Sequence, residues 1–235
     1  DLMPKLDEVL AAEPAEMFTG EPTPPREAIA SANAYLGAFP IAEALNQGAD
    51  IVVTGRCVDS AVTLGACIHR FGWQRDDLDF LAAGSLAGHL IECGPQVTGG
   101  NYTDWHEVAD TLHKVGYPIA EIEADGTMLI TKPKGTGGCV TIGTVGEQLL
   151  YEIGDPAAYY LPDVICDFTE VTVEQVDFDR IKVTGARGRG VPDQYKTSIT
   201  WADGWRAGML GFYVGARAAE KARMFADEAV QRARR

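Results

Sequence analysis

The stretch PIAEALNQGADIVVTGRCVDSAVTLGACIHRF at residues 40–71 carries helix and strand signals in close succession. A proline and a glycine bound a first helix over 41–47. The β-branched run at 50–54 is typical of a buried parallel strand, and residues 55–60 form the turn into a second helix over 61–71. Helix, strand, loop and helix in this order predict an α/β unit, whose functional sites lie at the carboxyl ends of its strands.

The rest of the chain predicts mainly antiparallel structure. A helix over 78–93 ends before Pro95, because proline disfavours helical geometry at the residue that precedes it. The turn at 124–126 predicts a hairpin, and Thr144 with Glu147 predicts a capping box at the start of another helix. The hairpin strands are expected at 118–123 and 127–132, further strands at 163–165, 169–173, 180–184, 197–201 and 206–213, and a terminal helix at 216–234.

These elements predict a fold between α/β and α+β. It would have a mixed sheet with α/β units at the front, and antiparallel strands plus a terminal helix at the rear. Residues 1–30 are acidic and rich in proline, which predicts a linker segment. We expect residues 31–235 to form a single mixed α/β domain. Because the sequence begins with Asp1 rather than methionine, we expect it to belong to a longer chain.

The composition is that of a globular protein with a strong acidic excess. Twenty basic and 34 acidic side chains give a net charge of −14, which disfavours nucleic acid and anionic membranes as partners. No apolar run reaches the roughly 18 residues that a membrane span needs. Five cysteines without a CxxC motif favour reduced thiols and therefore a cytoplasmic protein. The histidines form no ligand motif, so we predict neither a metal site nor a cofactor.

The sequence ITKPKGTGGCVTIGTVGE at 130–147 places lysines, glycines and a helix start side by side. Glycines let a backbone approach a ligand closely, and a helix N-terminus favours anions. The loop matches neither the Walker motif nor the dinucleotide motif GxGxxG. It therefore predicts either an anion-binding loop or a tight turn between a hairpin and a helix. In the first case the anion would contact Lys132, Lys134, Gly135, Thr136, Gly137 and Gly138.

A second basic loop covers 185–190 and contains Arg187 and Arg189. Guanidinium groups bind phosphate and carboxylate through pairs of hydrogen bonds. The loop is therefore either a clamp for such an anion or a solvated turn.

Two polar side chains follow the predicted strand at 50–54. Arg56 would bind a carboxylate through two hydrogen bonds, and Asp59 would act as a base or orient one. The structural alternatives are that Asp59 or Ser60 caps the next helix, and that Arg56 pairs with Asp59.

A third group lies at the end of the predicted helix 78–93, where His89, Glu92 and Cys93 share one face. Glu92 would lie in the last turn, where the helix dipole and burial both favour its neutral form, which suits a general acid or base. Cys93 beside His89 would form a nucleophile pair, but without a third, orienting residue. The alternative is a buried helix end with a satisfied histidine and a small apolar cysteine.

Three segments, 31–60, 81–100 and 131–159, resemble the AtuA-type acyclic terpene utilisation family. The resemblance implies that this chain is the central and rear part of the family's main domain. It also implies bacterial catabolism of acyclic terpenoids such as citronellol and geraniol, whose intermediates are coenzyme A thioesters. The family's recurrent motifs fall on the loops described above, and they add Gln96 and Thr98 to the expected substrate-binding residues.

We therefore expect a cytoplasmic catabolic enzyme that acts on a branched acyl-CoA or a related carboxylate. Asp59, Glu92 and Arg56 would carry acid/base chemistry of the lyase, hydratase or isomerase type. The alternative is a non-catalytic subunit that binds acyl-CoA or docks a partner enzyme. Nicotinamide-dependent oxidation is only weakly indicated, because no dinucleotide fingerprint is present. The expected partners are a small-molecule substrate and further copies in a homo-oligomer.

Overall fold

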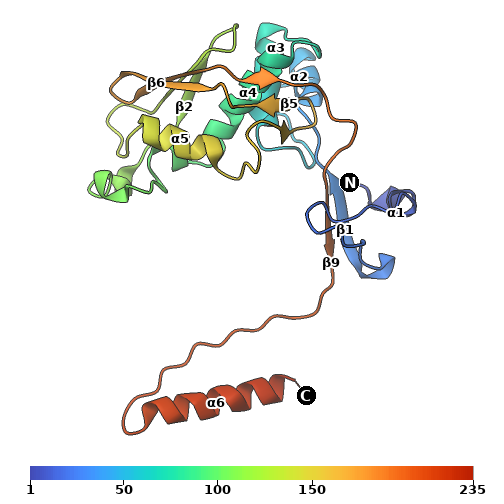
Figure 1. Cartoon of the computed structure of the whole chain (residues 1–235), viewed down its shortest axis with the longest axis vertical. Coiled ribbons are helices and arrows are strands. Elements are labelled where there is room, and N and C mark those ends of the chain that lie inside the picture. Colours follow the sequence, from blue (N-terminus) through green and yellow to red (C-terminus); the bar gives the residue numbers. More distant parts are fainter. Residues whose placement is uncertain (235) are drawn as a thin grey trace. The chain divides into compact units, whose positions relative to one another are not determined.

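Figure 1 shows the computed structural model of the protein, which describes residues 1–234. The chain divides into two compact units, Asp1–Thr200 and Trp201–Arg235. The expected extent of the domain, 31–235 within a longer chain, stays a prediction. In the described residues, no helix combines the length and the apolar character that crossing a membrane requires.

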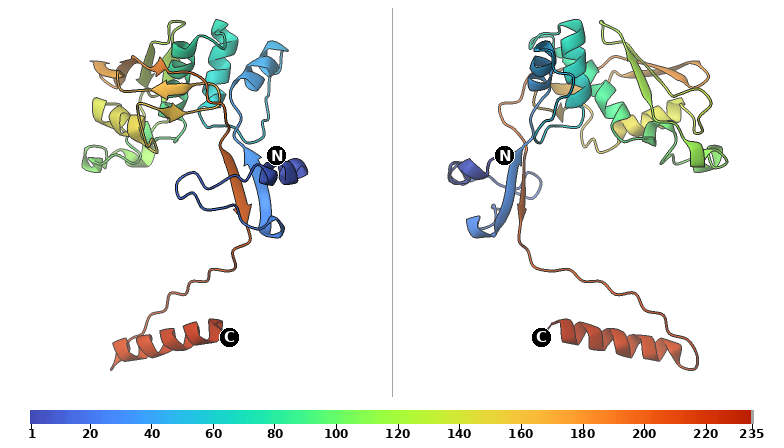
Figure 2. Two further views of the ribbon diagram at one scale, coloured as in Figure 1. Left: turned by 45° about the vertical axis from the view of Figure 1, so that its right-hand side comes forward. Right: turned by 180° about the vertical axis from the view of Figure 1, so that it is seen from behind.

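Three helices of the first unit pack side by side in chain order, as Figure 2 shows: α2 (Phe39–Asn46), α3 (Ala61–Phe71) and α4 (Leu78–Ile91). The central element is α4, whose residues 81–90 are all buried. Its small and apolar side chains lie on every face, which is typical of a helix covered on all sides. Gly84 permits the close approach of α3, because a Cβ there would lie 2.7 Å from Leu64 Cδ1.

The strands of the first unit form three sheets. The largest has the order β2-β3-β7-β6, and all its neighbours run antiparallel. A second sheet has the order β4-β5-β8, also antiparallel, and β1 pairs with β9 in a third. The strands are β1 (Ile29–Ala34), β2 (Ile119–Ile122), β3 (Met128–Thr131), β4 (Tyr159–Tyr160), β5 (Ile165–Asp167), β6 (Thr172–Asp177), β7 (Arg180–Thr184), β8 (Arg187–Gly188) and β9 (Thr197–Trp201).

The remaining helices are short except for the last one. α5 (Ile142–Leu150) contacts α4 and β6 in the first unit, and α6 (Ala218–Ala233) belongs to the second unit. The others are η1 (Met3–Lys5), α1 (Leu6–Ala11), η2 (Arg26–Ala28), η3 (Gln96–Thr98), η4 (Trp105–Glu107) and η5 (Leu112–Lys114).

One large apolar core joins the helices to two of the sheets. Leu81, Leu86 and Leu90 of α4 share this core with Met128 of β3 and Ile181 of β7. A smaller core of three buried residues lies near the amino terminus: Leu6, Ile29 and Ala32. α4 is therefore the helix against which the elements that carry the polar loops are assembled.

The predicted fold class is confirmed as a mixed α and β fold of the α+β kind, with antiparallel sheets and a terminal helix. The predicted helix at 61–71 and the strands at 180–184 and 197–201 have the predicted bounds. The hairpin around 124–126 is also present, as β2 and β3. These elements are specified by local apolar periodicity and turn residues, so the sequence alone predicts them well.

The predicted parallel strand at 50–54 is wrong, and so is the strand at 206–213. Both segments lie outside any strand. Ile51 and Val53 are 84% and 92% exposed instead of buried. Within its own unit, neither segment is joined by a backbone hydrogen bond to another described part of the chain. The sequence supplies the β-branched residues of a strand, but a strand also needs a neighbour with which to pair.

The capping box of α5 starts three residues earlier than predicted. The Thr141 hydroxyl accepts a hydrogen bond from Thr144 N at 3.2 Å, and Thr141 N donates to Thr144 Oγ1 at 3.0 Å. Glu147, the predicted partner, accepts a hydrogen bond from Thr103 N instead. Threonine at the third helical position thus replaces the usual glutamate or glutamine of the motif.

We expect Thr141→Ala to lower the free energy of unfolding by about 1 kcal/mol, because an N-cap hydroxyl satisfies an otherwise free N–H. Thr141→Ser keeps the hydroxyl and is the matched control, with a much smaller effect. Urea unfolding of the two variants beside the original chain measures the difference. Equal losses for alanine and serine would contradict the capping role.

Candidate functional site

A cleft of about 540 Å³ opens between the loop before α3, the end of α4 and the residues that follow α5. Its lining combines acidic, thiol and apolar side chains. Three carboxylates face it, together with two cysteines. The lining residues are Cys57, Asp59, Val62, Thr63, Gly88, Ile91, Glu92, Cys93 and Glu152.

The two predicted acid/base residues, Asp59 and Glu92, line this one cleft although they come from different segments. Gly88 of α4 explains how they meet. A Cβ at this position would lie 2.7 Å from both Cα and O of Ser60, so only glycine lets the loop before α3 lie directly on α4. Asp59 precedes that contact in the loop, and Glu92 caps the same helix one turn further on.

The structural alternatives for Asp59 are not realised in the described residues. Ser60 is the N-cap residue of α3, and neither it nor Asp59 makes a side-chain capping hydrogen bond. Arg56 does not pair with Asp59 either. Its guanidinium carbon lies 5.3 Å from the centroid of the Tyr35 ring, outside the cleft lining. Asp59 therefore faces the cleft as a free carboxylate, whereas a direct role for Arg56 stays a prediction.

Glu92 is oriented by a buried histidine. His89 Nδ1 lies 3.3 Å from Glu92 Oε1, and the His89 side chain is only 3% exposed. The His89 ring packs against Tyr159 at a centroid distance of 6.0 Å. The carbonyl of His89 accepts a hydrogen bond from Gln148 Nε2 at 2.8 Å. His89 is thus held at both its ring and its backbone, which limits the positions that the Glu92 carboxylate can take.

Glu152 is the residue that the sequence analysis missed. It follows α5 with a φ of +58°, a left-handed conformation that is unfavourable for a residue other than glycine. Such strained positions cluster at functional sites. Glu152 belongs to no motif, and its place in the cleft depends on how the chain reverses after α5, so no local signal could have identified it.

The three carboxylates change the ionisation of their neighbours. Burial raises the pKa of the Cys93 thiol, a hydrogen bond from Gln148 opposes this, and the charges of Glu92, Glu152 and Asp59 raise it further. Burial, followed by the Glu92 charge, raises the pKa of Tyr159 to about 12. Cys93 therefore stays protonated near neutral pH, which is unfavourable for a nucleophile.

Within residues 1–234, no group of three or more histidine, cysteine, aspartate and glutamate side chains is placed to hold a metal ion.

The model of the acyclic terpene utilisation family protein AtuA matches residues 1–235, the whole sequence. The chain belongs to the AtuA family. Its role accordingly lies in acyclic terpene utilisation. The match includes residues 1–30, which the sequence resemblance had left aside. No curated protein and no solved structure matches the chain.

Only some of the residues that the AtuA resemblance identifies as functional candidates lie in the cleft. Asp59, Glu92 and Cys93 line it, whereas the glycine-rich loop at 135–138 and the pair Gln96 and Thr98 do not. Thr98 is fully buried, and its hydroxyl donates to Gly116 O at 2.5 Å or to Pro95 O at 2.9 Å. Gln96 begins the short helix η3. Substrate binding by Gln96 and Thr98 stays a prediction.

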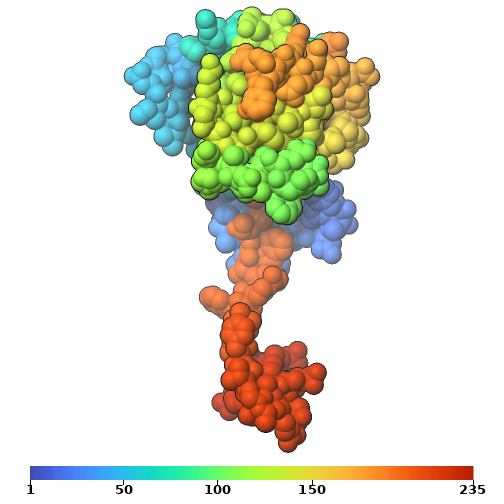
Figure 3. All heavy atoms as spheres, turned by 90° about the vertical axis from the view of Figure 1, so that its left-hand side faces the viewer, coloured from blue at the N-terminus to red at the C-terminus, as the bar shows by residue number. Residues whose placement is uncertain are grey.

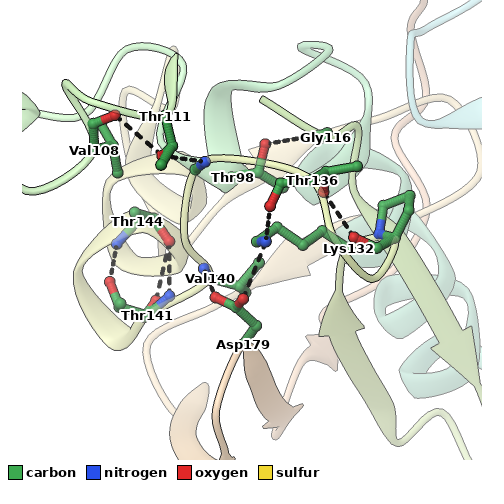
Figure 4. A network of polar contacts seen from close by, with 12 residues as sticks. Thr98, Val108, Thr111, Gly116, Lys132, Thr136, Val140, Thr141, Thr144 and Asp179 are labelled. Carbon is green, nitrogen blue, oxygen red and sulfur yellow. Dashed lines mark hydrogen bonds and ion pairs between the residues drawn. The ribbon is translucent and has the colours of Figure 1, made fainter. Parts of the chain in front are cut away.

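Figure 4 shows that Lys132 holds the loop together. Its ammonium group lies 3.1 Å from Asp179 Oδ2 and donates to Thr136 O at 2.9 Å. Asp179 Oδ1 also accepts a hydrogen bond from Val140 N at 2.8 Å. The Lys132 side chain is almost fully buried, so its charge is neutralised inside the loop. Lys134, in contrast, is exposed.

Most backbone N–H groups of this loop likewise donate hydrogen bonds to other groups of the protein. Gly137 N donates to Lys114 O at 2.8 Å, and Cys139 N donates to Thr98 O at 3.0 Å. Gly138 N donates to the Thr111 hydroxyl at 3.0 Å, and Thr136 N lies 3.4 Å from Pro133 O. These bonds describe the tight turn that was the alternative interpretation. An anion at this loop would have to displace them, with Lys134 and the N–H of Gly135 as the groups best placed to meet it.

The arginines of the second basic loop also bind carboxylates of the protein. Arg187 Nη1 lies 3.0 Å from Asp79 Oδ2, and Arg189 Nε donates to Asp167 Oδ2 at 2.7 Å. Asp167 is buried, and hydrogen bonds from Thr169, followed by those from Arg189, lower its pKa to about 2. Both arginines therefore have a structural partner, and their role as an anion clamp stays a prediction.

We expect Gly137→Ala to destabilise the protein by about 1–3 kcal/mol, the usual cost of overpacking. The reason is steric, since a Cβ at 137 would overlap the Thr111 carbonyl oxygen. Gly146→Ala in α5 is the matched control, because its Cβ would meet no atom within 4 Å and alanine favours a helix. Thermal unfolding compares the two. Equal stability of both variants would contradict this tight packing.

We expect Arg189→Ala to lower the free energy of unfolding at pH 7 by about 1 kcal/mol. This is the usual contribution of a charged hydrogen bond, reduced because the guanidinium is exposed to solvent. Because the pKa of Asp167 is lower in the folded protein than its ordinary value of 3.8, the ionised carboxylate stabilises the fold above pH 3.8. This stabilisation is lost as the pH falls through about 2, the pKa of Asp167 in the folded protein. The difference between variant and original chain should therefore shrink from pH 4 toward pH 2 in urea unfolding.

Arg187→Ala is the matched control for this measurement, because its partner Asp79 is half exposed and the pair contributes little. A loss for Arg187→Ala as large as that for Arg189→Ala, or a difference that persists at the lowest pH, would show that the Asp167 pair does not act as described.

Proposed function

We propose that this AtuA family member is a cytoplasmic catabolic enzyme that moves protons on a branched acyl-CoA thioester from an acyclic terpenoid, in a lyase, hydratase or isomerase step. The observation that carries the proposal is the convergence of Asp59, Glu92 and Glu152 on one cleft. Three carboxyl groups around a single substrate supply both a proton acceptor and a proton donor.

The chemistry follows from the positions of these groups. One carboxylate takes a proton from the carbon next to the thioester carbonyl or from a water molecule, and a second carboxyl group returns a proton to the substrate. Glu92 is the better candidate where the carboxyl group must have a fixed orientation toward the substrate, because His89 Nδ1 lies 3.3 Å from Glu92 Oε1. His89 is a positioning residue in this scheme. Asp59 is exposed and lines the same cleft from the loop before α3.

The charge of the cleft favours a thioester over a free carboxylate as the reacting group. Among the described residues, no lysine or arginine lines the cleft, so the charge of a substrate carboxylate would meet acidic side chains without a cation to compensate it. A thioester is uncharged. Val62 and Ile91 provide apolar surface for a branched acyl chain, and a volume near 540 Å³ lies in the usual range for small-molecule sites.

The state of Cys93 also favours proton transfer over covalent catalysis. Its thiol lies in the same cleft, and burial and the neighbouring carboxylates raise its pKa, which disfavours the thiolate that covalent catalysis needs. The alternative proposal, a non-catalytic acyl-CoA-binding or partner-docking subunit, predicts binding of the same thioesters without any proton transfer.

We expect Asp59→Asn to abolish proton transfer while leaving the fold intact, because Asp59 is exposed and caps no helix. The assay incubates the protein with terpenoid acyl-CoA thioesters in D₂O and follows deuterium incorporation by mass spectrometry. This readout detects proton abstraction even where the complete reaction is reversible. Glu92→Gln and Glu152→Gln should reduce the exchange as well.

Asp110→Asn is the matched control, because it makes the same chemical change at an exposed position outside the cleft. It should exchange like the original chain. Saturable thioester binding without deuterium incorporation would favour the non-catalytic subunit. Full exchange in Asp59→Asn would remove Asp59 from the mechanism.

A further inference from the structure

The imidazole of His89 is enclosed within the first unit, near the carboxyl end of α4. Figure 3 shows one face of that unit, where β2 and β3 (yellow-green) and the hairpin of β6 and β7 (orange) form the surface; β3 and β7 share the apolar core with α4. The His89 side chain is only 3% exposed. Gln148 of α5 donates to its carbonyl, and Tyr159 of β4 packs against its ring. The surroundings of the imidazole are therefore set by the first unit alone.

The two ring nitrogens of His89 have different surroundings. Nδ1 lies 3.3 Å from Glu92 Oε1. Nε2 is buried and has no hydrogen-bond partner among the described residues. Ser85, one turn earlier on the same face of α4, and Gln148 both offer an oxygen in this buried region. Ser85 Oγ and Gln148 Oε1 are themselves without a partner, so neither accepts a hydrogen bond from Nε2.

This difference indicates which nitrogen carries the hydrogen. A neutral imidazole has a hydrogen on one nitrogen and a lone pair on the other. A hydrogen on Nε2 would be a buried donor without an acceptor, which is unfavourable, and the Nδ1 lone pair would then face the Glu92 carboxylate. A doubly protonated ring, or a neutral Glu92 that donates to Nδ1, would leave the same donor on Nε2. A hydrogen on Nδ1 instead bonds to an ionised carboxylate, which is the stronger kind of hydrogen bond.

We propose that His89 is neutral with its hydrogen on Nδ1, that it donates this hydrogen to Glu92 Oε1, and that Glu92 is thereby the proton acceptor of the cleft. The inference rests on the proposed function and assigns the abstraction of the proton to one residue. The C–H bond beside the thioester carbonyl breaks, its proton forms an O–H bond with Glu92, and its electron pair moves to the thioester as an enolate. His89 keeps its own hydrogen throughout and is a positioning residue.

The position of the hydrogen is measured on the original chain by NMR after labelling the histidines with ¹⁵N. Couplings between the ring nitrogens and the carbon-bound ring hydrogens distinguish a protonated nitrogen from a bare one. We expect a protonated Nδ1 and a bare Nε2 for His89. Substitution of each of the other histidines assigns their signals, so that His89 itself stays unchanged: His69, His106 and His113.

His89→Asn and His89→Gln are a matched pair for the deuterium exchange assay. Both remove the ring, but the asparagine amide places its N–H group near the position of Nδ1, whereas the glutamine amide places it near the position of Nε2. His89→Asn should therefore retain most of the exchange. His89→Gln should lose about a hundredfold, the order of loss expected when a reacting group is misplaced by about 1 Å. Affinity for the thioester and thermal stability should be alike in the two variants.

Two results would overturn the proposal. One is a hydrogen on Nε2, either in the other neutral form or in a doubly protonated ring. The other is an equal loss of exchange in the two variants at equal thermal stability, which would show that a donor at the Nδ1 position does not orient Glu92.

Failure of the proposed function gives a different result, namely an original chain that binds the thioester without any exchange. That result would remove Glu92 as a proton acceptor, whereas the NMR signals of His89 in the resting protein do not depend on it.

Discussion

The contact between Gly88 of α4 and Ser60 is the constraint on which the cleft depends. A side chain at position 88 would collide with Ser60, so the absence of a Cβ lets the loop before α3 lie on the helix. The helix ends with Glu92, and the loop carries Asp59. Their common cleft is therefore a result of backbone packing and needs no direct bond between the two carboxylates. A central helix that is buried on every face gives this arrangement a rigid base.

The cleft and the loops around it differ in how their charges are paired. Basic side chains that the sequence offered as anion-binding groups are paired elsewhere: Lys132 with Asp179, Arg187 with Asp79, and Arg189 with Asp167. The cleft keeps its carboxylates without a cation in its lining. Burial, together with the charges of these carboxylates, raises the pKa values of Cys93 and Tyr159. The charged pairs hold the surrounding loops, whereas the uncompensated carboxylates remain available for chemistry.

Much of the fold and part of the site could be predicted from the sequence because their determinants are local. The helix at 61–71 is specified by apolar periodicity, and Asp59 and Glu92 stand out as polar residues at the ends of predicted elements. Glu152 was missed because it has a left-handed backbone conformation after α5, which no neighbouring motif predicts. The anion loop stays a prediction. Its glycines allow close approach, and in the described residues the groups that approach are Thr111 and Thr98 of the protein itself.

The two predicted strands that the structure lacks, at 50–54 and 206–213, failed for one common reason. Strand propensity measures how well a residue fits a pleated, half-buried surface, and it says nothing about where the neighbouring strand comes from. Both segments have the side chains for such a surface, but within its own unit neither is joined by a backbone hydrogen bond to a described strand. The segment at 50–54 leads directly into the loop that carries Asp59. A neighbouring strand at 50–54 would therefore fix the point from which this part of the cleft begins.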